Sequence, residues 1–119
     1  MPDSTVLDPQ AIENLRALNP GDNDEFLREI AGIFLEDTPQ RIADLDQSAL
    51  ASDAARFIRA AHSIKGSSAN LGASSLRAVA ERLEHQARNQ GLAEVAGLVE
   101  QVKAEFARTQ VALHALLGQ

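Results

Sequence analysis

The fold class is easiest to predict from residues 52–72, which run SDAARFIRAAHSIKGSSANLG. Ser52 or Asp53 is suited to cap a helix, because its side-chain oxygen can accept a hydrogen bond from a backbone N–H of the first turn. Gly72 is suited to end that helix, since glycine readily adopts the left-handed conformation found there. At ~100° per residue, one mostly apolar face forms, and its members are Phe57, Ala60, Ile64, Ser67 and Leu71. The segment is therefore predicted to be an amphipathic helix.

Helix start and stop signals also occur at both ends of the chain. Asp8 followed by Pro9 predicts a short first helix, with Asp8 as the N-cap and Pro9 in the first turn. Ser74 can cap a helix that closes at Gly91, and a last helix is expected from about Leu92. Short connections between amphipathic helices favour antiparallel neighbours in a bundle.

A further helix is predicted to begin near Asp22, with Glu25 three residues later as its capping-box partner. Its apolar stripe extends to about residue 49, but Pro39 interrupts it. The pattern alone leaves two alternatives: one helix kinked at Pro39, or a new helix that Thr38 caps.

Length and composition predict one all-α domain. The 119 residues are 45% hydrophobic and 24% charged, which is ordinary for a globular chain. Ala, Leu, Arg, Glu and Gln are abundant and aromatic residues are scarce, which favours helix over strand. We expect residues 1–6 to be a flexible N-terminus and residues 7–119 to form the domain.

The formal net charge is -6, which disfavours nucleic acid as a partner. The chain has no cysteine, so it offers no thiol nucleophile or Cys-ligated zinc site. No apolar run is long enough to span a membrane, and the polar residues 1–5 do not resemble a signal peptide. These features predict a cytoplasmic protein without a membrane partner.

The outer face of the predicted helix within residues 52–72 is unusual for a solvated surface. His62 lies at its centre, and around it fall Ala55, Ile58, Arg59, Lys65, Gly66 and Ala69. Gly66 costs ~1 kcal/mol of helix propensity relative to Ala, but it leaves room for another molecule. A neutral imidazole is a nucleophile, and Lys65 three residues on can place a cation near it. This combination suits phosphoryl transfer.

Other interpretations of these residues remain open on geometry alone. His62 can be an ordinary solvated side chain, and Gly66 a packing compromise. A hydrolase using His62 and Ser68 lacks the G-x-S-x-G motif and its strand. A metal site is not expected, because the acidic and histidine side chains that cluster locally resemble a solvated face more than a ligand set: Glu81, Glu84 and His85.

Residues 61–73, AHSIKGSSANLGA, resemble the signature of the histidine-containing phosphotransfer (HPt) family. Residues 33–39, IFLEDTP, are similar to the second-helix pattern of that family, and Leu83-Glu84 fits the pattern of the following helix. The resemblance covers nearly the whole chain. It implies an antiparallel four-helix bundle with a short additional N-terminal helix, and it favours one kinked helix through Pro39.

The resemblance also implies roles for individual residues. His62 would be the phosphoacceptor in a phosphorelay of two-component signalling, and Lys65 its electrostatic stabiliser. The candidate docking residues surround His62 on the outer face: Ile58, Arg59, Gly66 and Ala69.

The implied partners are the receiver domain of a response regulator and a hybrid histidine kinase. The chain would be a phosphocarrier and not an enzyme. It would have no intrinsic cofactor or metal, because the receiver would supply Mg²⁺. A bundle completed within one chain predicts a monomer. The alternative function is a helical adaptor that docks a receiver or kinase without accepting phosphate.

Overall fold

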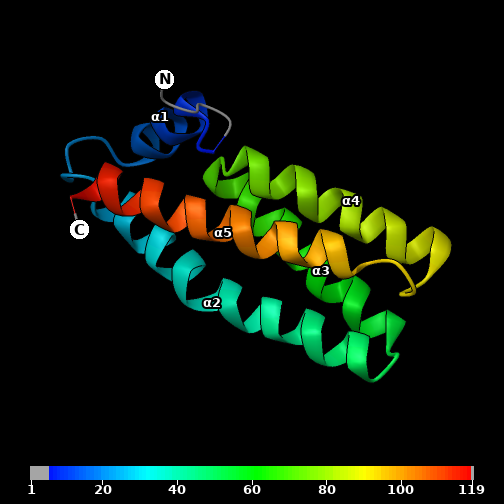
Figure 1. The fold of residues 1–119 in the computed structure, drawn as a ribbon. Helices are drawn as coiled ribbons and strands as arrows, with labels where there is room; N and C mark the ends of the chain where they lie inside the picture. The colour runs from blue at the N-terminus through cyan, green and yellow to red at the C-terminus, as the bar shows by residue number, and fades with distance from the viewer. Residues whose placement is uncertain (1–5, 119) are drawn as a thin grey trace.

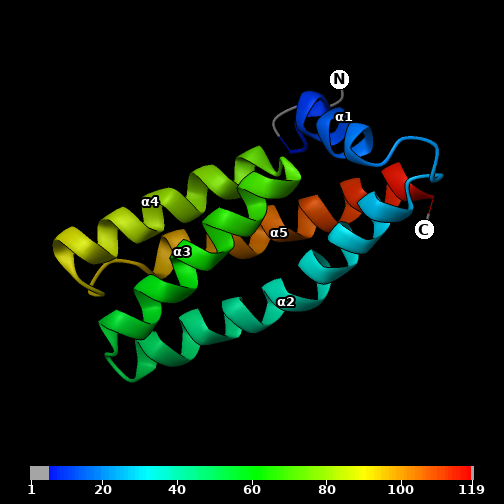
Figure 2. The same ribbon diagram turned by 180° about the vertical axis from the view of Figure 1, so that it is seen from behind.

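The computed structural model describes residues 6–118, and most of them lie in five helices. Four long helices run alternately up and down as a bundle, and a short N-terminal helix crosses the end at which α2 begins and α5 finishes (Figure 1, Figure 2). The helices are α1 (Pro9–Leu18), α2 (Glu25–Leu50), α3 (Ala54–Leu71), α4 (Ser74–Gln90) and α5 (Ala96–Leu117). The predicted four-helix bundle with an additional N-terminal helix is confirmed.

Each long helix packs against two others, in the cyclic order α2, α3, α4 and α5, and α1 contacts α2 and α3. The bundle encloses a single apolar core. Its largest fully buried side chains come from all four long helices and include Leu27, Leu45, Phe57, Ile64, Leu83 and Leu113. The core that buries the apolar faces of the helices therefore forms within one chain.

The boundary between α3 and α4 holds α1 in place. Gly72 caps α3 in the left-handed conformation, with φ of 80°. Its carbonyl oxygen accepts a hydrogen bond from the Asp8 backbone N–H at 2.7 Å. A Cβ added at Gly72 would lie 2.5 Å from the Cβ of Ala11. Both the positive φ and the close approach of α1 therefore require glycine here.

Several predicted helix ends are confirmed. The Asp8 side chain caps α1 by accepting from the Gln10 N–H at 3.0 Å. Of the two candidates before α3, Asp53 is the N-cap, and its carboxylate accepts from the Arg56 N–H at 3.1 Å. The helix α2 runs unbroken through Pro39. This continuity excludes a second helix beginning at Thr38.

The predicted start of α2 near Asp22 is wrong, because the helix begins at Glu25. Asn23 and Asp24 have positive φ values of 56° and 64°, which turn the chain before the helix. No capping box with Glu25 forms, since Asp24 is the N-cap. The Asp22 carboxylate instead accepts from the Phe26 N–H at 3.0 Å.

The predicted starts of α4 and α5 are also wrong. The N-cap of α4 is Ala73 and not Ser74, which is the first helical residue. The helix α5 is predicted to start near Leu92, but turns precede Val95, which is its N-cap.

Val6 belongs to the segment that is predicted to be flexible, but it is buried at 6% exposure. Residues 1–5 of that segment lie outside the described residues. Within the described chain, no helix is long and apolar enough to cross a membrane.

Candidate functional site

His62 lies in the middle of α3 with its imidazole turned outward, and its side chain is 62% exposed. The residues that anchor this part of α3, Ala61 and Ile64, are fully buried. The backbone beneath the imidazole is therefore fixed by core packing, while the ring is open to other molecules.

A buried carboxylate on α4 holds one edge of the imidazole. The Nδ1 atom of His62 lies 3.1 Å from Oε2 and 3.3 Å from Oε1 of Glu84. The Glu84 side chain is only 8% exposed. Two cations hold the same carboxylate: Lys65 Nζ is 3.0 Å from Oε1, and Arg88 donates to Oε2 at 2.9 and 3.1 Å.

These contacts keep Glu84 ionised. Burial by itself would raise the pKa of this carboxyl group, because a low-dielectric environment disfavours the charged form. Hydrogen bonds from Lys65, Arg88 and His62 outweigh burial and lower the pKa of Glu84 to about 2. At neutral pH the site therefore contains a fixed negative charge beneath the imidazole.

The ionised carboxylate determines which imidazole nitrogen is free. A carboxylate can only accept hydrogen bonds, so Nδ1 of His62 carries the hydrogen that faces Glu84. In the neutral ring, Nε2 is then unprotonated. This nitrogen lies on the ring edge away from Nδ1 and keeps its lone pair available.

Gly66 and Ala69 follow His62 along the exposed face of α3. A Cβ built at Gly66 meets nothing within 4 Å, and its φ is not among the positive values. Neither internal packing nor backbone conformation requires glycine at this position, so the packing explanation for Gly66 fails. The effect of the missing side chain is an open approach to the surface one turn beyond His62.

The other predicted docking residues lie before His62 on α3. Ile58 is half-buried and packs against the core, whereas Arg59 is exposed. Around the helix, Ile58 and Lys65 fall on the α4 side of His62, and Arg59 falls on the α2 side. All six predicted site residues thus lie on one continuous face.

The assignment of Ser67 to the core is wrong, because Ser68 occupies that place. Ser68 is 0% exposed, while Ser67 is half-buried and donates to the backbone oxygen of Ser63 at 3.0 Å. Compared with the predicted face, the buried face of α3 is rotated toward α4. Ser68 of α3 lies on this buried face. A fully buried Ser68 hydroxyl cannot serve as a surface nucleophile, so the hydrolase interpretation is not supported.

The sequence of the chain agrees with this geometry. Residues 29–112 match the Hpt domain, a stretch that includes His62 and runs from α2 into α5. The chain belongs to the Hpt domain family. Its Hpt domain is a phosphocarrier module.

Two relatives place this Hpt domain among known proteins. It is 31% identical over 83 residues to multistep phosphorelay regulator 1 of Schizosaccharomyces pombe, a match that covers 70% of this chain and 28% of the relative. The chain thus spans less than a third of that regulator. The crystal structure of histidine-containing phosphotransfer protein B (HptB) from Pseudomonas aeruginosa superposes with a TM-score of 0.87 at 28% identity, covering 98% of this chain and 97% of HptB.

The structure corrects one prediction about this Hpt site. The sequence pattern predicts that Glu84 lies on a solvated face with Glu81 and His85, but Glu84 is buried at 6% exposure. Its position gave a usable signal, because it lies four residues after Ala80 and one after Leu83, both in the core stripe of α4. An acidic residue bordering an apolar stripe indicates a carboxylate with internal partners.

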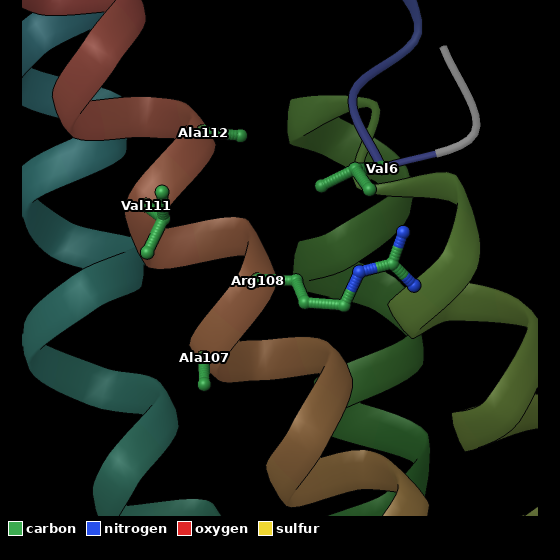
Figure 3. A pocket seen from close by; sticks show the side chains of 5 residues that line it. All are labelled: Val6, Ala107, Arg108, Val111 and Ala112. Atoms are coloured by element: carbon green, nitrogen blue, oxygen red, sulfur yellow. The ribbon is translucent and has the colours of Figure 1, made fainter. Parts of the chain in front are cut away.

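Two surface pockets of this Hpt domain lie away from His62. One lies between the N-terminal segment and α5, where Val6 faces Ala107, Arg108, Val111 and Ala112 (Figure 3). Another is lined by apolar and charged residues from the last turns of α2, the turn before α5 and the first turns of α5. No cluster of three His, Cys, Asp or Glu side chains suited to a metal ion occurs within residues 6–118.

Proposed function

We propose that this chain relays phosphoryl groups in a multistep phosphorelay through Nε2 of His62. The observation that supports the proposal best is the exposed imidazole whose Nδ1–H is held by the buried Glu84 carboxylate. This contact orients the ring and leaves Nε2 as the nucleophile. The relative from Schizosaccharomyces pombe, described as a multistep phosphorelay regulator, supports the same role.

In the proposed reaction, the lone pair of His62 Nε2 attacks the phosphorus atom of an aspartyl phosphate. The bond between phosphorus and the aspartate oxygen breaks, and the aspartate leaves as a carboxylate. No proton moves, because Nδ1 keeps its hydrogen throughout. The phosphorylated ring gains positive charge, which the Glu84 carboxylate at 3.1 Å stabilises. The reverse step uses the same contacts.

Lys65 is proposed to stabilise the negative charge of the transferred group. In the structure its ammonium binds Glu84, and its side chain is 28% exposed. The lysine stem has several rotatable bonds, so Nζ can turn toward a phosphoryl group without movement of the helix. Arg88 retains two hydrogen bonds to Glu84. The carboxylate would therefore remain neutralised when Lys65 moves.

We further propose that the partners are the receiver domain of a response regulator and a hybrid histidine kinase. The receiver would supply the aspartate and a bound Mg²⁺, which neutralises charge on the phosphoryl group. The open surface at Gly66 and Ala69 would admit the receiver backbone, and Ile58 would provide an apolar contact. We propose that the protein meets these partners in the cytoplasm.

The decisive experiment follows radiolabelled phosphate from a panel of purified receiver domains to the wild-type chain. The same transfer is measured with His62→Gln, and with His85→Gln as a control that removes an imidazole from α4 instead. Acid-labile, base-stable label on wild type and His85→Gln, but not on His62→Gln, is the expected result. Nitrogen-15 NMR should then show phosphorus on Nε2.

Two outcomes would overturn the proposal. If His62→Gln still became labelled, a residue other than His62 would be the phosphoacceptor. Receiver binding without any transfer to the wild-type chain would favour the helical adaptor instead.

A further inference from the structure

The helix that carries His62 has a charge opposite to that of the whole chain. From Ala54 to Leu71, α3 contains Arg56, Arg59 and Lys65 and no acidic residue. The formal net charge of the chain is -6, and all 17 of its acidic residues lie outside α3. A protein with so many carboxylates thus presents a cationic helix around its exposed imidazole.

Part of this charge lines a groove between α2 and α3, with a volume of about 340 Å³. The groove is lined by Arg41, Asp44, Arg56, Arg59, Ala60 and Ser63. Asp44 binds Arg56 at 2.6 Å and lies 3.5 Å from Arg41. Arg41 also pairs with Asp37 at 3.4 Å. Two carboxylates therefore hold two of the three guanidinium groups, and the charge of Arg59 leaves the groove positive.

Arg59 carries the uncompensated charge. It is exposed, and it forms no hydrogen bond or ion pair with any residue of the described chain. Its neighbour Arg56 is paired with Asp44, and Arg41 with Asp37 and Asp44, so Arg59 is the guanidinium of the groove that is left to bind a new anion. The Arg59 guanidinium can bind a carboxylate through two parallel hydrogen bonds.

The groove adjoins the imidazole. Arg59 precedes His62 by three residues, which is roughly 4.5 Å along the helix axis and 60° around it. Ser63 of the groove directly follows His62. A standard interface covers about 800 Å² per partner, a disc roughly 16 Å in radius. A protein that brings a reacting group to His62 would therefore also cover Arg59.

We propose that the α2–α3 groove binds an acidic side chain on the docking face of the receiver domain, with Arg59 as the contact that determines specificity. This inference rests on the proposed function. The positive potential would also attract the acidic face before contact, which raises the association rate. Receivers with a basic side chain at that place would be disfavoured by repulsion.

The test measures binding in a His62→Gln background, where no phosphoryl transfer can occur. The probe is a receiver domain that has passed phosphate to the wild-type chain in the experiment above. Association and dissociation rates are followed by stopped-flow fluorescence at several salt concentrations. We expect Arg59→Glu to slow association ~10-fold at low salt and about two-fold at 0.5 M salt, because ions screen the interaction.

Arg82→Glu is the matched control. It makes the same change in net charge, but on α4 and outside the groove. The Arg82 guanidinium donates a hydrogen bond to Gln101 of α5. Arg59→Lys should retain most of the association rate. Equal slowing by Arg59→Glu and Arg82→Glu, or no slowing by either, would overturn the groove proposal while leaving phosphotransfer through His62 intact. A failure of every receiver to phosphorylate the wild-type chain would overturn both.

Discussion

At the scale of single residues, the site depends on how one buried carboxylate is neutralised. Glu84 accepts hydrogen bonds from an imidazole, an ammonium and a guanidinium. A buried charge without partners would be strongly destabilising, and these three donors remove that penalty. In return, the carboxylate fixes the orientation and the tautomer of His62. Stability and reactivity are therefore linked at Glu84.

The first prediction concerns the tautomer of His62. In the wild-type protein at a pH where the ring is neutral, long-range nitrogen-15 NMR should show hydrogen on Nδ1. Glu84→Gln should keep this tautomer, because the amide oxygen still accepts a hydrogen bond. Glu84→Ala removes the acceptor and should give a mixture of tautomers. A wild-type ring with hydrogen mainly on Nε2 would contradict the proposed nucleophile.

The second prediction concerns stability at acid pH. The folded pKa of Glu84 is about 2, against an ordinary value of 4.5. The unfolded chain therefore binds more protons between these values, and stability falls as pH falls through that window. Ionised Glu84 should contribute about 3 kcal/mol at neutral pH.

Urea unfolding of wild type and Glu84→Gln from pH 7 to pH 2 tests this contribution. The difference between the two free energies of unfolding should shrink as the pH falls below about 4.5. Glu81→Gln on the exposed side of α4 is the control, and it should change stability by less than about 0.5 kcal/mol. If the difference in free energy of unfolding between wild type and Glu84→Gln did not vary with pH, ionisation of Glu84 would not contribute to stability as proposed.

The third prediction is that Lys65→Ala slows phosphotransfer about ten-fold or more, because an electrostatic stabiliser of the transferred group is lost. Circular dichroism should show unchanged helicity, since alanine is a strong helix former. The chain has one other lysine, Lys103 on α5, which binds Asp46 and Glu100. Lys103→Ala should leave the transfer rate unchanged. Equal rates for all three proteins would remove the role proposed for Lys65.

At the scale of elements, α3 combines a buried face that fixes the helix with an open face that is available for docking. Gly66 shows the cost of this arrangement. It lowers helix stability within α3, and no internal contact requires it. The fourth prediction is therefore that Gly66→Ala raises the free energy of unfolding by about 1 kcal/mol in urea titrations.

The same position should be sensitive to bulk and charge during docking. Gly66→Glu is expected to weaken receiver binding at least about ten-fold, because a buried unpaired carboxylate in an interface costs several kcal/mol. Gly97→Glu on α5 is the matched control, since its added Cβ also meets nothing within 4 Å and α5 does not contact α3. Titration calorimetry with the receiver measures both. Undiminished binding by Gly66→Glu would exclude an access role for Gly66.

At the scale of the whole molecule, the protein is an elongated bundle of 47 × 27 × 22 Å. Among residues 6–118, five large hydrophobic side chains are exposed; they lie on α1, α2 and α5, and none lies on the helix that carries His62. The fifth prediction is a monomer of 12.7 kDa in sedimentation equilibrium at micromolar concentrations. Its radius of gyration by solution scattering should be near the Cα value of 14.8 Å. If the measured mass rose toward twice this value as the protein concentration increased, the protein would self-associate.

The sequence determined much of the architecture because helix signals are local. Caps such as Asp8 and Asp53, the stop at Gly72 and apolar stripes of helical period depend only on near neighbours in the chain. The same helical period predicts that His62 lies on the outer face of α3. The starts of α2 and α5 were misplaced because several turn residues compete there, and packing selects among them.

Only the tertiary structure decided what surrounds His62. Glu84 and His62 are 22 residues apart, and the bundle brings them together by packing α4 against α3. The burial and low pKa of Glu84, and the arginine groove between α2 and α3, arise in the same way from contacts between helices. Periodicity shows which face of a helix is buried, but it does not show which residue of another helix lies opposite. The sequence by itself thus determined the helices and the exposed imidazole, whereas tertiary packing decided the tautomer, the charge and the neighbours of that imidazole.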